Sequence, residues 1–222
     1  RPPEGSFARM VLWQELGAVR GLDMVGQLLH VEGRVLPMSL VPLNIEADVL
    51  GVDPEHPDEV AVISGQHEVA ITHGQVEAIR LVPNDPPACP EAVAAIQEAD
   101  FVVLGPGSWF TSVLPHLLVP ELATAIIESD AHRILTLNIA PVAETAGISA
   151  ARHLEILAEH APGLRFDTIV VDASFGADDA TLQAYAHCLG ARLLIADVRR
   201  HDGTARHDPL RLASLFRDVM IS

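Results

Sequence analysis

In the second half of the chain, apolar runs of strand length alternate with segments of helical periodicity, and this alternation predicts an α/β fold. Alternating strands and helices favour a mainly parallel sheet with right-handed crossovers. Between residues 35 and 82, the pattern changes to short β-rich runs that turn residues separate. We therefore expect a single domain over residues 1–222, a Rossmann-like three-layer α/β/α arrangement with a small antiparallel β excursion, or flap, at residues 35–82.

The individual elements follow from the same patterns. Amphipathic spacing predicts helices at residues 7–16 and 22–30. Within the flap, β-rich runs predict strands at residues 41–49, 59–64, 68–72 and 75–82. After a Pro-rich link at residues 83–90, apolar runs predict the parallel strands at residues 101–104, 134–138, 168–172 and 193–196. The remaining helices are expected at residues 91–99, 110–118, 120–129, 149–160 and 180–189.

The most informative stretch begins where the first of these parallel strands ends. Leu104 leads into a Gly-Pro-Gly turn and then into a helix start that is rich in hydroxyl groups. Glycines let the backbone approach a ligand closely, and the free N–H groups at a helix start attract an anion. The alternative is a turn that only connects a strand to a helix. We expect a phosphate or nucleotide site built from Gly105, Pro106, Gly107, Ser108, Thr111 and Ser112.

Other residues join this site because ligands of parallel sheets bind beyond the carboxyl ends of the strands. That rule brings together the loops at residues 105–112, 138–145 and 173–178. Asn138 offers both a donor and an acceptor to ribose or phosphate oxygens, and Glu144 can accept from a sugar hydroxyl or hold a metal. Thr145 adds a hydroxyl. The alternative is that Asn138 forms a turn and the Glu144-Thr145 pair starts a helix.

Aromatic and histidine side chains allow two readings each. Trp109 and Phe110 can stack on a base, or they can be buried in the core. His153 and His160 share one face of a predicted helix, and without an evident third ligand we assign no metal site and expect surface or partly buried histidines. The pairs at residues 201–202 and 207–208 resemble metal ligands, but a solvated loop, or a helix cap at Asp208 before Pro209, is expected there.

Composition narrows the class of protein. The chain has 14 basic and 30 acidic residues and a formal net charge of -16, which argues against binding to nucleic acid or to an anionic membrane surface. No apolar run is long enough to span a membrane. Cys89 and Cys188 indicate free thiols and a reducing compartment, so we expect a cytoplasmic protein. Since the sequence begins at Arg1, we expect the natural N-terminus to lie upstream.

Several separated segments resemble the bacterial gluconeogenesis factors, which are homologous to 2-phospho-L-lactate transferase. They are GRVLPM at residues 33–38, GPGSWFTSVLPHLLVP at residues 105–120 and NIAPVAETAG at residues 138–147. The resemblance implies a Gly-rich strand-turn-helix at the start, which this sequence lacks. It also places Gly5 and Ser6 at a ligand-binding helix start, with Ser6 in place of an Asn. Before the Glu-Thr pair, the family pattern has Gly and this sequence has Ala143.

What the resemblance implies is a regulatory protein that binds a UDP-sugar such as UDP-N-acetylglucosamine, with effects on carbon partitioning and cell shape. The alternative is a transferase that moves a phospholactyl group from a nucleotide diphosphate to a deazaflavin alcohol, where Mg²⁺ would neutralise the diphosphate. A fold kept only for scaffolding is a third reading. The forms of residues 109–112 and 144–145 favour the first. We assign no catalytic residue and expect a homo-oligomer.

Overall fold

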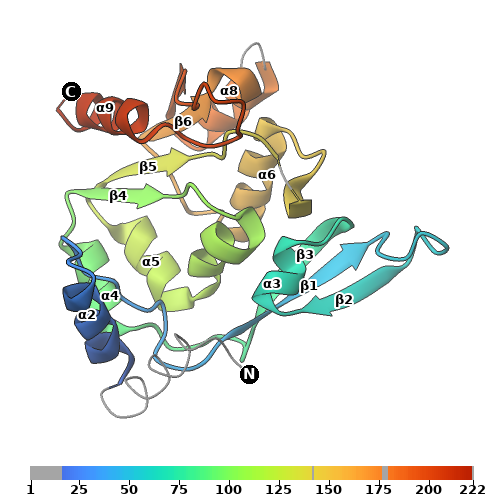
Figure 1. The fold of residues 1–222 in the computed structure, drawn as a ribbon, viewed down its shortest axis with the longest axis horizontal. Helices are drawn as coiled ribbons and strands as arrows, with labels where there is room; N and C mark the ends of the chain where they lie inside the picture. Colours follow the sequence, from blue (N-terminus) through green and yellow to red (C-terminus); the bar gives the residue numbers. More distant parts are fainter. Residues whose placement is uncertain (1–16, 142, 177–179, 222) are drawn as a thin grey trace.

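The computed structural model describes residues 17–141, 143–176 and 180–221. They form two sheets, a parallel sheet with the strand order β4-β5-β6-β7 and an antiparallel sheet with the order β2-β1-β3. Figure 1 shows the parallel sheet among helices and the antiparallel flap projecting to one side. The predicted α/β fold, with a mainly parallel sheet and a small antiparallel excursion, is confirmed.

The parallel sheet is built from four short apolar strands: β4 (Phe101–Leu104), β5 (His132–Thr136), β6 (Thr168–Asp172) and β7 (Arg192–Ala196). Every residue of the central strand β6 is buried. A strand that is buried throughout is typical of a parallel sheet with cover on both faces. The edge strands are less protected, since Val103 and Ile195 are exposed. The strands end in register at one side, with Leu104 opposite Leu135 and Asp172 opposite Ala196.

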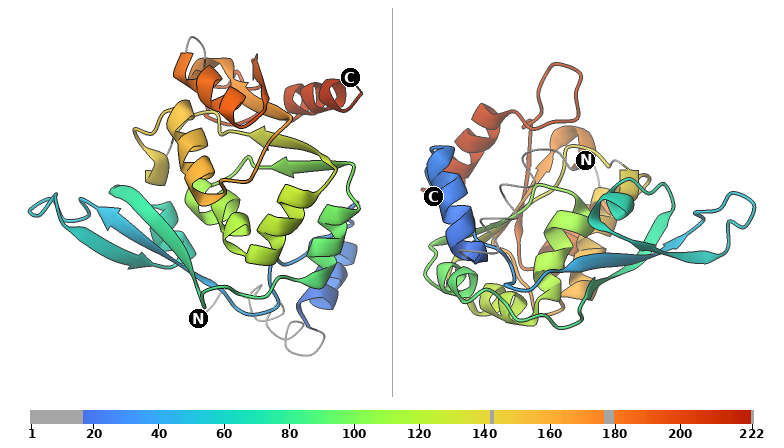
Figure 2. Two further views of the ribbon diagram at one scale, coloured as in Figure 1. Left: turned by 180° about the vertical axis from the view of Figure 1, so that it is seen from behind. Right: turned by 60° about the horizontal axis from the view of Figure 1, so that its bottom comes forward.

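Helices flank this sheet along the chain. They are α2 (Ala18–Leu28), α4 (Pro90–Gln97), α5 (Pro120–Glu128), α6 (Ala150–His160), α7 (Ala173–Gly176), α8 (Ala180–Cys188) and α9 (Pro209–Met220). α4 packs on α5, and α6 packs on α8. In Figure 2, α2 and α9 lie on the side of the molecule away from the flap. The helix cap expected at Asp208 is confirmed, because its carboxylate accepts from the N–H groups of Leu210 and Arg211.

The flap consists of β1 (Asn44–Leu50), β2 (Val60–Ser64) and β3 (Gln75–Val82), with β1 in the middle. Its inner face is apolar, since Ile45, Ala47 and Val49 are buried. On its outer face, Arg80 binds Glu46 at 2.9 Å and Asp48 at 2.8 Å. The edge strand β2 exposes Val60 and Val62.

The strand predicted at residues 68–72 is wrong. The segment forms the short helix α3 (Gln66–Ala70) instead, which packs against β1 and directs Val69 into the core. A run of five residues is too short for its apolar spacing to distinguish helix from strand, and packing decides it. The side-chain amide of Gln66 donates to the carbonyl oxygen of Thr111 at 3.3 Å, so α3 also contacts the segment after β4.

The segment predicted as a helix at residues 110–118 does not form an α-helix. It forms one turn that is wider than an α-helical turn and one that is tighter. They are η1 (Trp109–Val113), a π-helical turn, and η2 (Leu114–Leu118), a 3-10 turn. Pro115 has no N–H group, so it interrupts the regular hydrogen-bond ladder. Leu114 and Leu117 are buried, which makes this segment part of the central core.

Within the described part of the chain, no single helix has the length and apolar character to cross a membrane. One consecutive pair, residues 109–118 and α5, passes that test together on length and composition only, and it is bent by 83°. The side chains of Leu114, Leu122 and Ile126 in this pair are buried in the core.

His153 lies in the core of the molecule and not at its surface, so the expectation of a surface or partly buried histidine is wrong for this residue. It is 2% exposed, its Nδ1 lies 2.8 Å from the carbonyl oxygen of Ser149, and its ring meets the edge of Trp109 at 4.9 Å between centroids. Burial lowers the pKa of His153, against a smaller opposite effect of the Ser149 carbonyl. The folded state therefore keeps this imidazole neutral at pH values where the unfolded chain binds a proton.

We expect the free energy of unfolding to fall as the pH drops below about 6.5, by up to about 1.4 kcal/mol per pH unit for each such histidine. Urea unfolding between pH 7.5 and 5 should show a shallower decline in His153→Gln than in the unaltered chain. His160→Gln is the matched control, since its Nδ1 makes the same 2.8 Å contact, to Ile156, in a half-buried place. Equal declines in the His153 variant and the unaltered chain would contradict the expectation.

Candidate functional site

The turn after β4 requires glycine at its first position. Gly105 has φ of 75°, a left-handed conformation that side chains disfavour. A Cβ atom there would lie 2.5 Å from the carbonyl oxygen of Thr136 in the neighbouring strand β5. Only a residue without a side chain lets the chain leave β4 this close to β5, so Gly105 positions the turn that follows.

A side-chain amide fixes the next part of the turn. Asn138 Oδ1 accepts from the N–H group of Gly107 at 3.1 Å, and Asn138 Nδ2 donates to the carbonyl oxygen of Gly107 at 2.8 Å. The loops after β4 and β5 therefore lie together, as the strand-end rule predicts. Both of the groups through which we expected Asn138 to meet a ligand are, however, used to hold the backbone.

Ser108 links the turn to the loop of Glu144. Its hydroxyl group donates to Glu144 Oε1 at 2.7 Å and accepts from the N–H group of Thr111 at 3.2 Å, and the two hydroxyl oxygens of Ser108 and Thr111 lie 2.5 Å apart. A hydroxyl group has one proton, so the hydroxyl of Thr111 donates to that of Ser108. Glu144 and Thr111 are each only 6% exposed. The three side chains form a closed network below the surface.

Other residues form the solvent-accessible surface of the turn. Pro106 and Ser112 are exposed, while Gly107 and Ser108 are half-buried. Within the described residues, no acceptor pairs with the backbone N–H groups of Trp109 and Phe110, which begin η1. Thr145 is 1% exposed, so its side chain belongs to the interior of the loop.

Trp109 and Phe110 are 1% and 2% exposed, and this burial favours the core-packing alternative over stacking on a base. The indole ring of Trp109 lies against His153, whose ring in turn meets Phe175 at 5.8 Å. The indole Nε1 of Trp109 is buried without a hydrogen-bond partner among the described residues. Gly5 and Ser6 lie outside the described residues.

The loop before Glu144 departs from regular backbone geometry. Ala143 has φ of 45°, in the left-handed region that glycine adopts without strain. An alanine takes up this conformation at a steric cost that a glycine would not have. The short turn η3 (Ala143–Thr145) packs against η1, α3 and β3, and these contacts hold it in place.

The third expected loop, after β6, begins with α7, and residues 177–179 of it lie outside the description. A residue that the sequence did not single out organises this end of the sheet. Asp172 is 2% exposed, and its carboxylate accepts from Ser174 N–H at 2.9 Å, from Ser174 Oγ at 2.5 Å and from Val198 N–H at 3.0 Å. The position of Asp172 at the end of a predicted strand was the feature of the sequence that could have identified it.

A metal at Glu144 was one of the two roles that the sequence left open for that side chain. Across residues 17–141, 143–176 and 180–221, no group of three or more His, Cys, Asp or Glu side chains is arranged to hold a metal ion. His201 instead contacts Asp197 at 3.1 Å, and Asp202 accepts from Thr204 N–H at 3.0 Å within its own loop.

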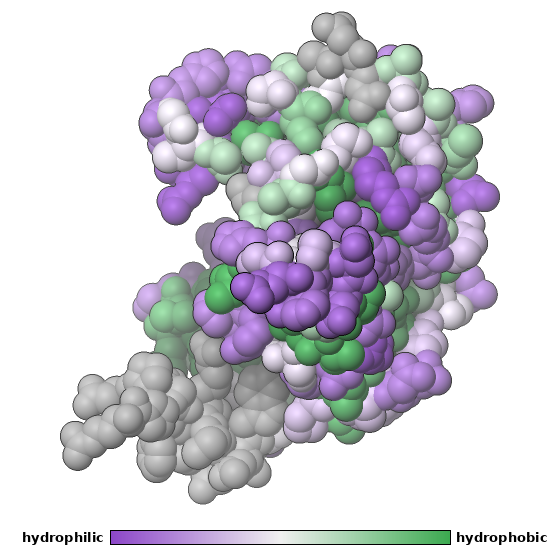
Figure 3. Space-filling model, turned by 90° about the vertical axis from the view of Figure 1, so that its right-hand side faces the viewer, coloured by the Kyte–Doolittle hydropathy of each residue, from purple (hydrophilic) through white to green (hydrophobic). Residues whose placement is uncertain are grey.

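Glu144 also lines a cavity of about 430 Å³. It is bounded by the start of β3, the loop after Glu144 and the first turns of α6. Figure 3 looks at the molecule from the flap side and shows hydrophilic residues over the flap, with an indentation between the flap and the part above it. Glu144 is thus shared between the turn network and this cavity.

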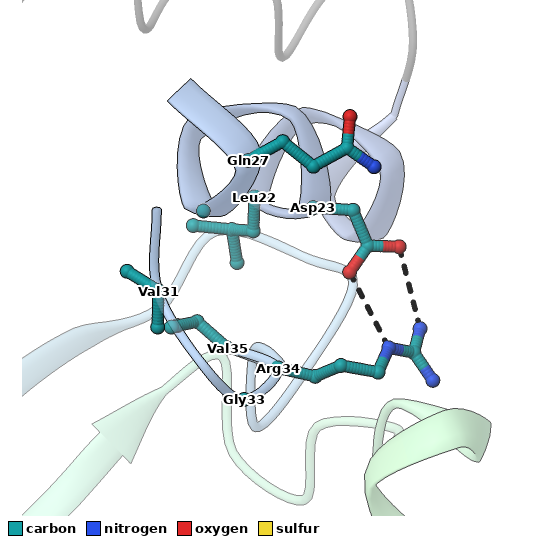
Figure 4. Close-up of a pocket in the computed structure, with 8 residues that line it drawn as sticks. Leu22, Asp23, Gln27, Val31, Gly33, Arg34 and Val35 are labelled. Atoms are coloured by element: carbon teal, nitrogen blue, oxygen red, sulfur yellow. Dashed lines mark hydrogen bonds and ion pairs between the residues drawn. The ribbon is translucent and has the colours of Figure 1, made fainter. Parts of the chain in front are cut away.

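Residues 33–35, at the start of the segment GRVLPM, line a separate, smaller cavity of about 250 Å³ at α2. Arg34 reaches Asp23 with two contacts of 3.4 Å beside it (Figure 4). The lining of this cavity includes Leu22, Val31 and Val35 but no residue of the turn after β4. The end of the segment does reach the candidate site, because Pro37 and Met38 line another cavity, of about 270 Å³, together with Thr111.

Comparison with known proteins adds to this geometry. The family model described as 2-phospho-L-lactate transferase CofD matches residues 8–210. A Mycobacterium tuberculosis protein named "Putative gluconeogenesis factor" is 49% identical over 205 residues, which are 90% of this chain and 59% of that protein. A Halalkalibacterium halodurans protein named "Gluconeogenesis factor" is 31% identical over 142 residues, which are 64% of this chain and 42% of that protein.

Solved structures show the same relationship. A crystal structure of a UPF0052 family member from Bacillus halodurans superimposes with a TM-score of 0.77 at 25% identity, and the match covers 98% of this chain and 71% of that one. The chain spans 59% of the length of the mycobacterial relative, so the relative contains further sequence.

The close approach at Gly105 predicts a large loss of stability in Gly105→Ala. The left-handed backbone alone costs a non-glycine residue about 1 kcal/mol, and the clash with Thr136 adds roughly 1–3 kcal/mol. Gly203→Ala is the matched control, since Gly203 has φ of 83° with nothing within 4 Å of its added Cβ. Denaturant unfolding should show the larger loss in Gly105→Ala, and equal losses would argue against the clash.

Proposed function

This chain belongs to the CofD family, and from that premise we propose that it is the ligand-binding part of a regulatory protein that binds a nucleotide sugar. The ligand is a UDP-sugar such as UDP-N-acetylglucosamine, with its diphosphate at the turn after β4. The regulatory role concerns carbon partitioning and cell shape. The names of the mycobacterial and Halalkalibacterium relatives, which call those proteins gluconeogenesis factors, support a role in carbon metabolism.

The observation that carries the proposal is the closed network of Ser108, Thr111 and Glu144. The oxygen of Ser108 gives its only proton to Glu144 and accepts from both the N–H group and the hydroxyl of Thr111. All of its hydrogen-bonding positions are therefore used. The network holds the turn in one shape before a ligand arrives, which lowers the entropic cost of binding.

In this shape, the groups that remain for an anion among the described residues are the backbone N–H group of the half-buried Ser108 and the exposed hydroxyl of Ser112. The unpaired N–H groups of Trp109 and Phe110 belong to residues that are only 1% and 2% exposed. Local donors are needed because the chain carries a net charge of -16 and repels anions at longer range. Backbone N–H groups suit phosphate oxygens, since they are fixed in direction and carry no counter-charge.

A binding role also fits the chemistry of Ser108. A hydroxyl beside a carboxylate resembles an activated nucleophile, but two hydrogen bonds from Thr111 occupy both lone pairs of the oxygen. A nucleophile needs a free lone pair that points at the substrate. Ser108 is therefore a positioning residue of the turn.

The second candidate is transfer of a phospholactyl group to a deazaflavin alcohol, and the description of the matching family model favours it. In that case Glu144 would hold a divalent cation, and the cation would neutralise the diphosphate. Incubation with activated phospholactate and the deazaflavin alcohol distinguishes the two candidates. Formation of the joined product would support the transferase, and its absence alongside tight UDP-sugar binding would support the regulatory protein.

Calorimetric titration with UDP-N-acetylglucosamine tests the proposed site. We expect Ser108→Ala to weaken binding about ten-fold, since a turn without its anchor loses pre-organisation worth roughly 1.4 kcal/mol. Ser112→Ala should weaken binding by a smaller factor and leave the unfolding temperature unchanged. Ser214→Ala on α9 serves as the control and should bind as the unaltered chain does. Failure of the unaltered chain to bind any UDP-sugar would reject the proposal.

A further inference from the structure

The cavity that Glu144 lines has the size and chemistry of a ligand site. Its volume of about 430 Å³ falls within the range of roughly 300–1,000 Å³ that small-molecule sites occupy. Gly74, at the start of β3, lines it and has no room for a side chain, because a Cβ there would lie 2.6 Å from the carbonyl oxygen of Leu50. Gly74 therefore lets the chain enter β3 close to the end of β1 within the flap.

Glu144 is the residue that distinguishes this cavity from an ordinary surface depression. Its side chain is more than nine-tenths buried and lines the cavity, and Oε1 accepts from Ser108. Among the described residues, no donor reaches its second oxygen, Oε2. Oε2 is not one of the side-chain atoms that are buried without a partner, so it stays accessible to a ligand that supplies an O–H or N–H group.

The charges around the cavity favour a neutral ligand over an anion. Arg152 is the cationic lining residue, and it is held by Glu155 at 2.6 Å and Glu159 at 3.1 Å. The other ionisable groups of the lining are Glu144, Glu77 and His73. Glu77 accepts from the side-chain amide of Gln75 at 2.6 Å. Such a lining is rich in acceptors and repels phosphate, but it suits a neutral molecule with several hydroxyl groups.

We propose that this cavity is the subsite for the sugar of the nucleotide sugar, and that Glu144 Oε2 accepts from a sugar hydroxyl group. The inference rests on the proposed function, because the diphosphate would lie at the turn after β4, which Glu144 contacts through Ser108. One carboxyl group then ties the two parts of the site together. Its Oε1 accepts from Ser108 and so holds the turn, and its Oε2 accepts from a hydroxyl group of the sugar.

The ratio of the dissociation constants of UDP and UDP-N-acetylglucosamine tests this subsite, because it isolates the contribution of the sugar. In Ala146→Phe, an exposed lining residue fills the cavity. We expect binding of the UDP-sugar to weaken by roughly ten-fold while binding of UDP stays within about two-fold. Ala78→Phe is the matched control, since Ala78 is exposed on the outer face of the flap and lies opposite Asp48 in β1.

Glu144→Gln is a second variant, which tests the subsite independently if Ala146→Phe fails to fold. Its amide oxygen still accepts from Ser108, but an NH₂ group replaces the acceptor that faces the sugar. The UDP-sugar should again lose its advantage over UDP. Thermal unfolding of each variant checks that the fold is kept.

The outcomes separate the two proposals. If the unaltered chain binds UDP and the UDP-sugar equally, or if both variants keep the unaltered ratio, the sugar subsite is wrong and the diphosphate site stands. Weaker binding of UDP itself in Glu144→Gln, only when Mg²⁺ is present, would make Glu144 a metal ligand and also overturn the subsite. If neither nucleotide binds the unaltered chain, the proposed function fails and the subsite fails with it.

Discussion

The candidate site depends on the pair of hydrogen bonds between the side chain of Asn138 and the backbone of Gly107. Beyond the ends of β4 and β5, no regular ladder of backbone hydrogen bonds holds the two loops together in the described residues. The amide of Asn138 acts there as a further backbone unit, with one donor and one acceptor. Each of its bonds contributes on the order of 1 kcal/mol. The position of Ser108, and through it the contact with Glu144, follows from where Gly107 is held.

The parts of the fold that the sequence predicted are those in which local pattern and packing agree. The strands at residues 75–82, 101–104 and 168–172 have the predicted bounds, because each is an apolar or alternating run between turn residues. The strand expected at residues 134–138 runs from His132 to Thr136, since pairing with β4 and β6 sets its limits. In α3, contacts with β1 and η1 decide the structure, and these are invisible to a five-residue pattern.

For the site, the sequence predicted which loops meet but not what their side chains do there. The strand-end rule placed the loops of Gly107 and Asn138 together. It could not show that the side-chain amide of Asn138 forms its hydrogen bonds with the backbone of Gly107, or that Trp109 faces His153 in the core. These directions depend on how η1 packs against α6 and η3. The role of Asp172 was equally hidden, because its partner Val198 lies in a segment after a different strand.

The flap has a consequence for how copies of this protein behave toward one another. Its edge strand β2 reads VAVIS, without a charged residue, and presents Val60 and Val62 at 57% and 60% exposure. An uncharged apolar edge is a template for strand-to-strand association between molecules. What opposes it is the mutual repulsion of chains with a net charge of -16. Near the isoelectric point of about 4.9 that repulsion vanishes while the edge remains, so association of copies through β2 is favoured as the pH approaches that value.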